Sequence, residues 1–229
     1  MKSKKAVVLM SGGLDSVVSA YYLKNKKIDI KYSLFFNYGQ KALLQERKAS
    51  KFFALKLNSE FIEIKLPFLN KITGTSLVSK VDTPEMNFHK LNDPEYTCQS
   101  AVSVWVPNRN GLFINVAASY ADSYNLDYII TGFNSEEAAT FPDNSTSFIK
   151  AVNKSLSYST LNKAEVISPF HKKNKFDIVK KAVKLDVDLS MIYSCYNGYN
   201  KQCGICESCI RFKNALMMNN INSNKFFQI

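Results

Sequence analysis

Two short stretches of this chain carry residues whose types and spacing could do chemistry. The first is Ser-Gly-Gly-Leu-Asp-Ser at 11–16, and the second holds Cys195, Cys203, Cys206 and Cys209 within fifteen residues. The first combines hydroxyls, paired glycines and a carboxylate, which suit an anion and a cation held side by side. The second offers four thiols to one centre, which suits a metal ion.

The 11–16 stretch lies between an apolar run at 5–10 and a helical pattern at 14–23. It is therefore predicted to be a loop at the carboxyl end of a strand, where paired glycines let the backbone approach a ligand. The N–H groups and dipole of the following helix favour a phosphate. Asp15 would repel that phosphate unless a divalent cation lies between them, so we expect Mg²⁺ at Asp15.

The four clustered cysteines indicate tetrahedral Zn²⁺. Because all four positions are cysteine, no coordination position stays open, and the ion is predicted to be structural. An iron–sulfur cluster is the second interpretation, and unliganded thiols are the third. The fifth cysteine, Cys98, stands alone. The odd count argues against a disulfide framework, and we expect Cys98 to be a small buried residue.

Apolar patterning predicts the elements that must position these residues. Short apolar runs predict strands at 5–10, 28–38, 61–64, 126–131 and 166–167. Helical spacing predicts helices at 14–23, 41–55, 112–124, 147–160, 176–185 and 208–218. Residues 66–106 are less regular and contain breaks at Pro84 and Pro94, so we expect a lid-like excursion there. Alternating strands and helices predict an α/β fold with a doubly wound parallel sheet, whose ligands bind at the carboxyl ends of the strands.

Composition supports a globular protein. The 229 residues are 46% hydrophobic and 21% charged, and no apolar run approaches the ~20 residues of a membrane helix. We therefore expect a cytoplasmic protein without a membrane partner. The net charge of +11 comes from 27 lysines and only three arginines, spread along the chain. We interpret it mainly as solvated surface, which argues against a nucleic-acid partner, and a basic face for an anionic partner is the alternative.

The complete Ser-Gly-Gly-x-Asp-Ser pattern after the first strand resembles the PP-loop ATP pyrophosphatases. That resemblance implies an adenine nucleotide α-hydrolase-like fold in which the loop holds the pyrophosphate of ATP. It also implies adenylation of a carbonyl-type oxygen on the substrate, followed by displacement of AMP by a nucleophile.

The loop and the cysteine cluster together resemble the QueC/ExsB family of 7-cyano-7-deazaguanine (preQ0) synthases. Further matches along 5–215 are Asn-Tyr-Gly-Gln at 37–40, Val-Pro-Asn-Arg-Asn at 106–110, Thr-Gly at 131–132 and Phe-Pro-Asp at 141–143. The chain departs from the family pattern at Leu14, at Asn108 and in the loop 132–143.

The resemblance implies an ATP-dependent carbon–nitrogen ligase of queuosine biosynthesis. Such an enzyme converts 7-carboxy-7-deazaguanine and ammonia to preQ0 through adenylated intermediates. Its partners would be ATP, ammonia and the 7-deazaguanine acid, and its cofactors one structural Zn²⁺ and Mg²⁺ with ATP. No glutaminase-like segment is visible, so free ammonia is expected. Whether the chain forms a homodimer stays open.

The resemblance also implies roles for individual residues. The expected ATP-binding residues are Met10, Ser11, Gly12, Gly13, Leu14, Asp15, Ser16, Val17, Val18 and Phe36. Asp15, Ser16 and Arg109 are the expected catalytic residues. Arg109, Asp143 and Glu136 are expected to bind the substrate, with Glu136 and its neighbour Glu137 also considered for a metal or an ammonium ion. We expect an ATP-binding domain at 1–190 and a zinc-binding segment at 191–229.

Three other functions stay open. The first is a QueC-like paralogue with a different acceptor, since the loop 132–143 departs from the family pattern. The second is a tRNA-modifying PP-loop enzyme, a thiolase or lysidine-type ligase, although only Cys98 would remain to carry sulfur. The third is a zinc-stabilised adaptor without activity, against which the complete 11–16 motif argues.

Overall fold

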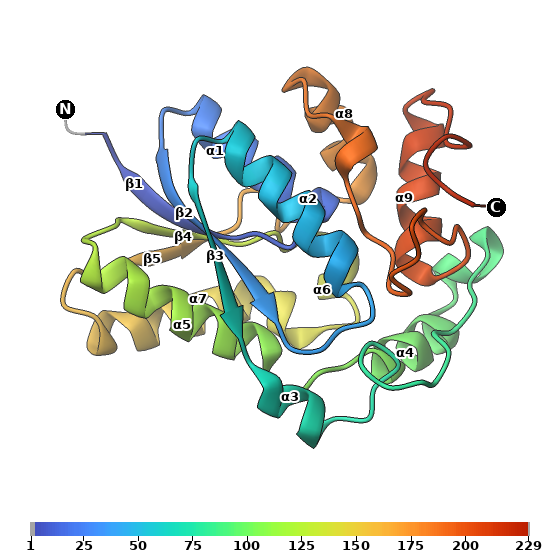
Figure 1. Cartoon of the computed structure of the whole chain (residues 1–229), viewed down its shortest axis with the longest axis horizontal. Helices are drawn as coiled ribbons and strands as arrows, with labels where there is room; N and C mark the ends of the chain where they lie inside the picture. Colours follow the sequence, from blue (N-terminus) through green and yellow to red (C-terminus); the bar gives the residue numbers. More distant parts are fainter. Residues whose placement is uncertain (1–2, 229) are drawn as a thin grey trace.

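The computed structural model describes residues 3–228, and one parallel five-stranded sheet organises them (Figure 1). The strands are β1 Lys5–Leu9, β2 Asp29–Asn37, β3 Glu60–Lys65, β4 Tyr128–Ile130 and β5 Glu165–Ile167. Their order across the sheet is β3-β2-β1-β4-β5, and every neighbouring pair is parallel. The predicted doubly wound parallel sheet is confirmed. The direction of winding reverses beside β1, and such a reversal opens a crevice for ligands at the carboxyl ends of the strands.

Helices connect the strands in the predicted alternation. The helices are α1 Leu14–Asn25, α2 Leu43–Lys56, α3 Pro67–Ile72, α4 Pro94–Ser103, α5 Arg109–Ser123, α6 Ser135–Ala138, α7 Thr146–Ser159, α8 Lys175–Lys184 and α9 Glu207–Met218. Three short 3-10 helices lie at Phe88–Asn92, Pro142–Asn144 and Leu189–Met191. All five predicted strands and six predicted helices are present, with ends that differ by a few residues.

The core is divided by the sheet because successive strand side chains point to opposite faces. Ala6 and Val8 pack into one cluster with α1, α2, α8 and α9, whereas Val7 packs into a second cluster with α5 and α7. Figure 1 shows the same layers, with α1 and α2 on one side of the sheet and α5 and α7 on the other. Burial on both faces explains why these strands are apolar runs rather than alternating patterns.

The segment 66–106 is more helical than predicted. Pro94, interpreted as a break, is the first residue of α4, where its missing N–H costs no hydrogen bond. Asp93 caps this helix by accepting a hydrogen bond from the Glu95 N–H at 3.0 Å. The segment 66–106 also contacts the predicted zinc-binding segment 191–229, called the cysteine segment below. The Met86 N–H donates a 2.8 Å hydrogen bond to the Ile205 carbonyl.

The expectation that Cys98 is buried is wrong, because this residue is exposed on α4. The buried side of that short helix is made by Thr97, Ser100 and Ala101. Cys98 therefore lies on the side that faces solvent.

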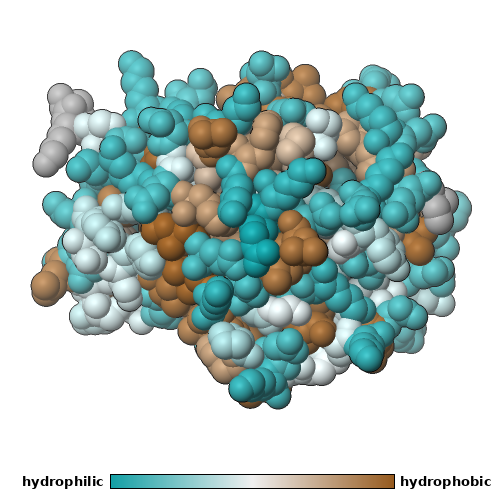
Figure 2. Space-filling view, in the orientation of Figure 1, coloured by the Kyte–Doolittle hydropathy of each residue, from teal (hydrophilic) through white to brown (hydrophobic). Residues whose placement is uncertain are grey.

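The surface agrees with the scattered charge of the sequence. In Figure 2, hydrophilic side chains alternate with smaller apolar patches over the visible face. Within residues 3–228, none of the helices combines the length and apolarity needed to cross a membrane.

Candidate active site

The loop 11–16, called the phosphate loop below after its expected ligand, follows β1 directly and leads into α1. Gly12 has φ +77°, and a Cβ there would lie 2.6 Å from the Ala49 Cβ, so both conformation and space require glycine. Gly13 is the N-cap of α1 and makes no side-chain cap hydrogen bond. The hydroxyls of Ser11 and Ser16 lie 3.0 Å apart on the same side of the turn. The loop therefore presents hydroxyls and a helix N-terminus at the carboxyl edge of the sheet, as an anion site requires.

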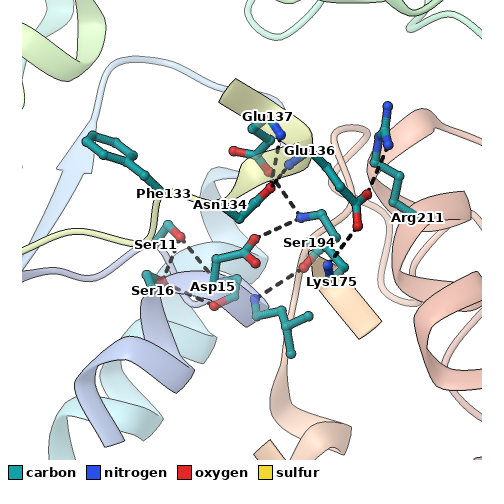
Figure 3. A network of polar contacts seen from close by, with 12 residues as sticks. Ser11, Asp15, Ser16, Phe133, Asn134, Glu136, Glu137, Lys175, Ser194 and Arg211 are labelled. Atoms are coloured by element: carbon teal, nitrogen blue, oxygen red, sulfur yellow. Dashed lines mark hydrogen bonds and ion pairs between the residues drawn. The ribbon is translucent and has the colours of Figure 1, made fainter. Parts of the chain in front are cut away.

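The strongest polar contact of the loop is an ion pair with a distant lysine. Lys175 Nζ at the start of α8 lies 2.8 Å from Asp15 Oδ2 and 3.1 Å from Glu137 Oε1 (Figure 3). The lysine side chain is only 4% exposed. Burial opposes its charge, but the two carboxylates hold the pKa of Lys175 above its usual value. One buried cation thus joins carboxylates from two different loops.

The two carboxylates respond differently to burial. Asp15 is 14% exposed and Glu137 is 34% exposed. Burial raises the pKa of Asp15 to about 6, although Lys175 acts in the opposite direction. Burial also acts on Glu137, but there the charge of Lys175 prevails and the pKa is lowered. Asp15 Oδ1 is buried and has no hydrogen-bond partner among the described residues, so it is available to a ligand.

The end of β4 completes this edge of the site. A Cβ on Gly132 would lie 2.5 Å from the Ser16 backbone nitrogen, so the β4 loop contacts the phosphate loop closely. The Thr131 hydroxyl is buried beside it and, within residues 3–228, makes no hydrogen bond. Asn134 then caps α6 by accepting hydrogen bonds from the N–H groups of Glu136 and Glu137, at 3.0 and 2.9 Å. This cap fixes the backbone from which Glu137 reaches Lys175.

Aromatic rings surround another part of the cleft. The rings of Trp105 and Phe141 are nearly parallel, at 8°, with centroids 6.1 Å apart. Arg109 begins α5 and donates a 3.1 Å hydrogen bond to the Tyr38 hydroxyl. Asp143 lines the same cleft, and burial raises its pKa while the charge of Arg109 partly offsets that effect. The cleft thus offers flat apolar surfaces together with one guanidinium and one carboxyl group.

The departure at Asn108 has a structural reason. Asn108 is the N-cap of α5 and has φ 51°. Among residues with a side chain, asparagine is one of the few that tolerates this left-handed conformation. Asn108 therefore adopts the left-handed conformation that a glycine would adopt at this turn, and Arg109 remains the first residue of α5.

These features line one cleft of about 240 Å³. Of the predicted site residues, the following line it: Met10, Ser11, Gly13, Asp15, Ser16, Phe36, Arg109 and Asp143. The following do not: Gly12, Leu14, Val17, Val18 and Glu136. Leu14, Val17 and Val18 are buried in the core beneath the loop. Glu136 turns aside to Arg211, at 3.0 Å.

Sequence reasoning missed several residues of the cleft. Lys175 is one of 27 lysines and belongs to no recognisable local pattern. Glu46 lines the cleft from α2, accepts a 2.8 Å hydrogen bond from Gln40, and has its pKa raised to about 6 by burial. Ser194 and Tyr196, on either side of Cys195, also line the cleft. The one available signal was the position of these two residues beside a predicted metal ligand.

The four cysteines meet in one buried cluster. All four are buried, and their sulfur atoms lie within 4.8 Å of one another. Backbone N–H groups of Asn197 and Cys203 each donate to the Cys195 sulfur at 3.4 Å, and such donors stabilise a thiolate. Gly198, with φ +74°, lets the chain turn there, where a Cβ would lie 2.1 Å from the Lys41 carbonyl oxygen. The cluster can therefore hold a metal ion.

Comparison with known proteins gives consistent results. The model of the family described as "Queuosine biosynthesis protein QueC" matches residues 5–220. A protein named 7-cyano-7-deazaguanine synthase from Pelotomaculum thermopropionicum is 48% identical over 213 residues, covering 92% of this chain and 96% of that protein. A protein of the same name from Methanobrevibacter smithii is 41% identical over 219 residues, covering 95% of each.

A solved structure supports the fold. The NMN synthetase of Francisella tularensis superposes with a TM-score of 0.52, at 15% sequence identity, covering 98% of this chain and 81% of that chain. At this identity the similarity concerns the fold alone.

Proposed function

Because this chain belongs to the QueC family of queuosine biosynthesis proteins, we propose that it converts 7-carboxy-7-deazaguanine and ammonia to 7-cyano-7-deazaguanine at the expense of ATP. The observation that carries this proposal is the match to relatives of that name over more than nine-tenths of both chains. The cleft supports it independently, because it places an anion-binding loop beside a buried carboxylate and next to aromatic surfaces.

The chemistry requires two activations of the same carbon. A carboxylate is a poor electrophile, so its oxygen first attacks ATP, forming an acyl adenylate and releasing pyrophosphate. Ammonia then attacks the carbonyl carbon, a carbon–nitrogen bond forms, AMP leaves and one proton is lost. Adenylation of the resulting amide oxygen by a second ATP releases pyrophosphate, and loss of AMP together with both protons of the amide nitrogen leaves the nitrile. Each step depends on positioning and on stabilising charge.

We assign the phosphates of ATP to the loop 11–16. The Ser11 and Ser16 hydroxyls and the start of α1 would bind them, and Phe36 lies at the end of β2, where the adenine would fit. Asp15 would hold Mg²⁺ between itself and the phosphates. The unpartnered Asp15 Oδ1 supports this assignment, because a hard cation takes carboxylate oxygens and satisfies a buried atom of this kind.

We assign Lys175 to the same step. Its ammonium group neutralises Asp15 and Glu137 when no nucleotide is bound, and it lines the cleft. Negative charge develops on the departing pyrophosphate during adenylation, and a fixed cation beside it lowers the energy of the transition state. Ser16 and Asp15 would act with it from the loop 11–16.

We assign the deazaguanine acid to the aromatic part of the cleft. Trp105 and Phe141 offer parallel faces for a flat heterocycle. Arg109 would bind the substrate carboxylate with its planar fork of donors. Asp143 would accept hydrogen bonds from the two N–H donors on the guanine-like edge. Glu136, expected to share this role, points toward Arg211 instead.

We propose that the cysteine cluster holds structural Zn²⁺. Sulfur atoms bound tetrahedrally at ~2.3 Å from one ion lie about 3.8 Å apart. Cys203 and Cys209 have this separation, with their sulfurs 3.8 Å apart. Thiolates of a four-iron cluster bind different irons and lie farther apart, so the compact cluster favours a single ion. A reducing compartment such as the cytoplasm would keep these thiols available.

The deciding experiment is an ATP-dependent assay with 7-carboxy-7-deazaguanine and ammonium. We expect release of pyrophosphate and AMP that depends on the acid, with the nitrile detected by mass spectrometry. Release that depends instead on a different acid would indicate a paralogue. Release that depends on tRNA, together with a gel shift that survives physiological salt, would indicate a tRNA-modifying enzyme.

A further inference from the structure

A second, much smaller hollow adjoins the main cleft. Its volume is about 10 Å³, compared with about 240 Å³ for the cleft. Among the residues that line both are Glu137, Phe141, Lys175 and Tyr196. These side chains therefore separate the two spaces, and a molecule in the hollow would lie next to the cleft.

The size of the hollow limits what it can hold. A cavity of about 10–15 Å³ has room for a single water molecule. A nucleotide, a purine or a hydrated metal ion is much larger. Ammonia and ammonium are close to water in size, so they fit where the other components of the reaction do not.

The lining of the hollow suits a small cation. Glu136 and Glu207 line it without lining the cleft, and both pair with Arg211, at 3.0 and 2.8 Å. Together with Glu137 they place three carboxylates against the two cations Lys175 and Arg211, an excess of one negative charge. Figure 3 shows the side chains of Glu136, Glu137, Lys175 and Arg211 converging from α6, α8 and α9.

Aromatic side chains add to this environment. Tyr196 and Phe141 also line the hollow, and the face of an aromatic ring attracts a cation. A strongly acidic hollow without counter-ions would instead favour a cation of higher charge, such as a divalent metal ion. The charged residues that line this hollow instead sum to one negative charge, in a space that holds one small molecule.

We propose that this hollow is the ammonium site, from which the nitrogen reaches the adenylate in the adjoining cleft. The inference rests on the proposed function, because it names the place where one substrate of that reaction binds. Ammonium has no free electron pair, so it first gives one proton to a carboxylate of the lining. The resulting ammonia attacks the adenylate, which forms the carbon–nitrogen bond and breaks the bond to AMP, and a second proton is then lost from the nitrogen.

Thr140 provides the test, because it lines the hollow but not the cleft. Thr140→Leu would fill the space, and Thr140→Val, which has nearly the shape of threonine, is the matched control. We expect Thr140→Leu to raise KM for ammonium about tenfold or more, with KM for ATP and for the acid within about twofold of wild type. Thr140→Val should resemble the wild type in all three. An unchanged KM for ammonium in a folded Thr140→Leu protein would overturn the proposal.

An enlarged hollow gives a second, independent readout. Wild-type protein should disfavour methylamine relative to ammonia by about 10- to 100-fold, because the extra methyl group does not fit. Thr140→Ala should relax this preference and yield the N-methyl amide, detected by mass spectrometry. Equal use of methylamine by the wild type would show that nitrogen enters through the open cleft and would refute the site.

The two proposals fail in different ways. If the wild type shows no acid-dependent pyrophosphate release, the proposed function is wrong, and the ammonium site falls with it. If the wild type shows acid-dependent pyrophosphate release, but KM for ammonium in Thr140→Leu and the preference among amines in Thr140→Ala are both unchanged, only the ammonium site is wrong.

Discussion

The backbone N–H of Tyr193 donates a 3.0 Å hydrogen bond to the carbonyl of Gly12, which joins the cysteine segment to the phosphate loop. Two residues further on, Cys195 enters the cysteine cluster. Between them, the Ser194 hydroxyl accepts a longer 3.4 Å hydrogen bond from the Leu14 N–H. The cluster therefore supports the wall of the cleft at the loop 11–16, to which we assign the phosphates of ATP.

Removal of the metal should weaken nucleotide binding. Without the ion, the four thiols lose their common partner, and the segment that holds Gly12 loosens. We expect the Kd for Mg²⁺–ATP, measured by calorimetry, to rise about tenfold or more in chelator-treated protein. Cys209→Ser should behave in the same way, and Cys98→Ser is the matched control that should not. An unchanged Kd in protein proven free of metal would show that the cluster does not support the loop.

Asp15→Asn should remove activity without disturbing the metal cluster. The substitution keeps the shape of the side chain but removes the charge that would hold Mg²⁺. We expect kcat/KM to fall about 10²- to 10³-fold, the effect of losing one electrostatic contact to a transition state. The zinc content, measured by atomic emission, should stay at the wild-type value. Turnover near the wild-type rate would rule out a role for Asp15 in holding the cation.

Lys175→Met should destabilise the protein. The lysine is 4% exposed and pairs with Asp15 and Glu137, and its loss would leave the mostly buried Asp15 and the partly exposed Glu137 without their cation. Breaking a buried pair in this way costs about 3–5 kcal/mol in the free energy of unfolding, measurable with urea. Lys184→Met, on an exposed position of the same helix, should change stability by less than about 0.5 kcal/mol. Equal effects of the two substitutions would contradict the structural account of this ion pair.

Arg109→Lys should act mainly on the acid substrate. Lysine keeps the charge but lacks the planar fork that binds a carboxylate through two hydrogen bonds. We expect KM for the acid to rise about tenfold or more, with KM for ATP little changed. Arg47→Lys is the control, because Arg47 pairs with Glu63 at 2.7 Å and does not line the cleft. A rise confined to KM for ATP would indicate that Arg109 binds the phosphates of ATP instead of the acid.

Glu46 should make stability depend on pH. Burial raises its pKa from 4.5 to about 6, so the folded protein binds more protons than the unfolded chain between these values. Stability therefore falls as pH rises through this window. Glu46→Gln keeps an acceptor for Gln40 and should stabilise the protein at pH 7 on the order of 1–2 kcal/mol. Urea unfolding at pH 4 should show little difference between the two proteins, and the same gain at both pH values would refute the explanation.

The elements of the fold could be read from local patterns. The strands at 5–10 and 28–38 are apolar runs because they are buried on both faces, and their periodicity is a property of a few neighbouring residues. The helix α4 was missed because the same proline that ends one helix can begin another. At Pro94 the difference was decided by Asp93, which caps the new helix.

The phosphate loop and the metal ligands were accessible from the amino-acid order alone, because each is a contiguous or closely spaced motif whose chemistry depends on neighbours in the chain. Lys175 was not, because it lies 160 residues from Asp15 and 38 from Glu137. Only the folded chain brings this lysine, one of 27, between two carboxylates. The stability and role of a buried charge depend on such partners, which local sequence does not specify. The small hollow beside Thr140 has the same origin, since it is formed by side chains of four separate segments, at 136–141, 175, 196 and 207–211.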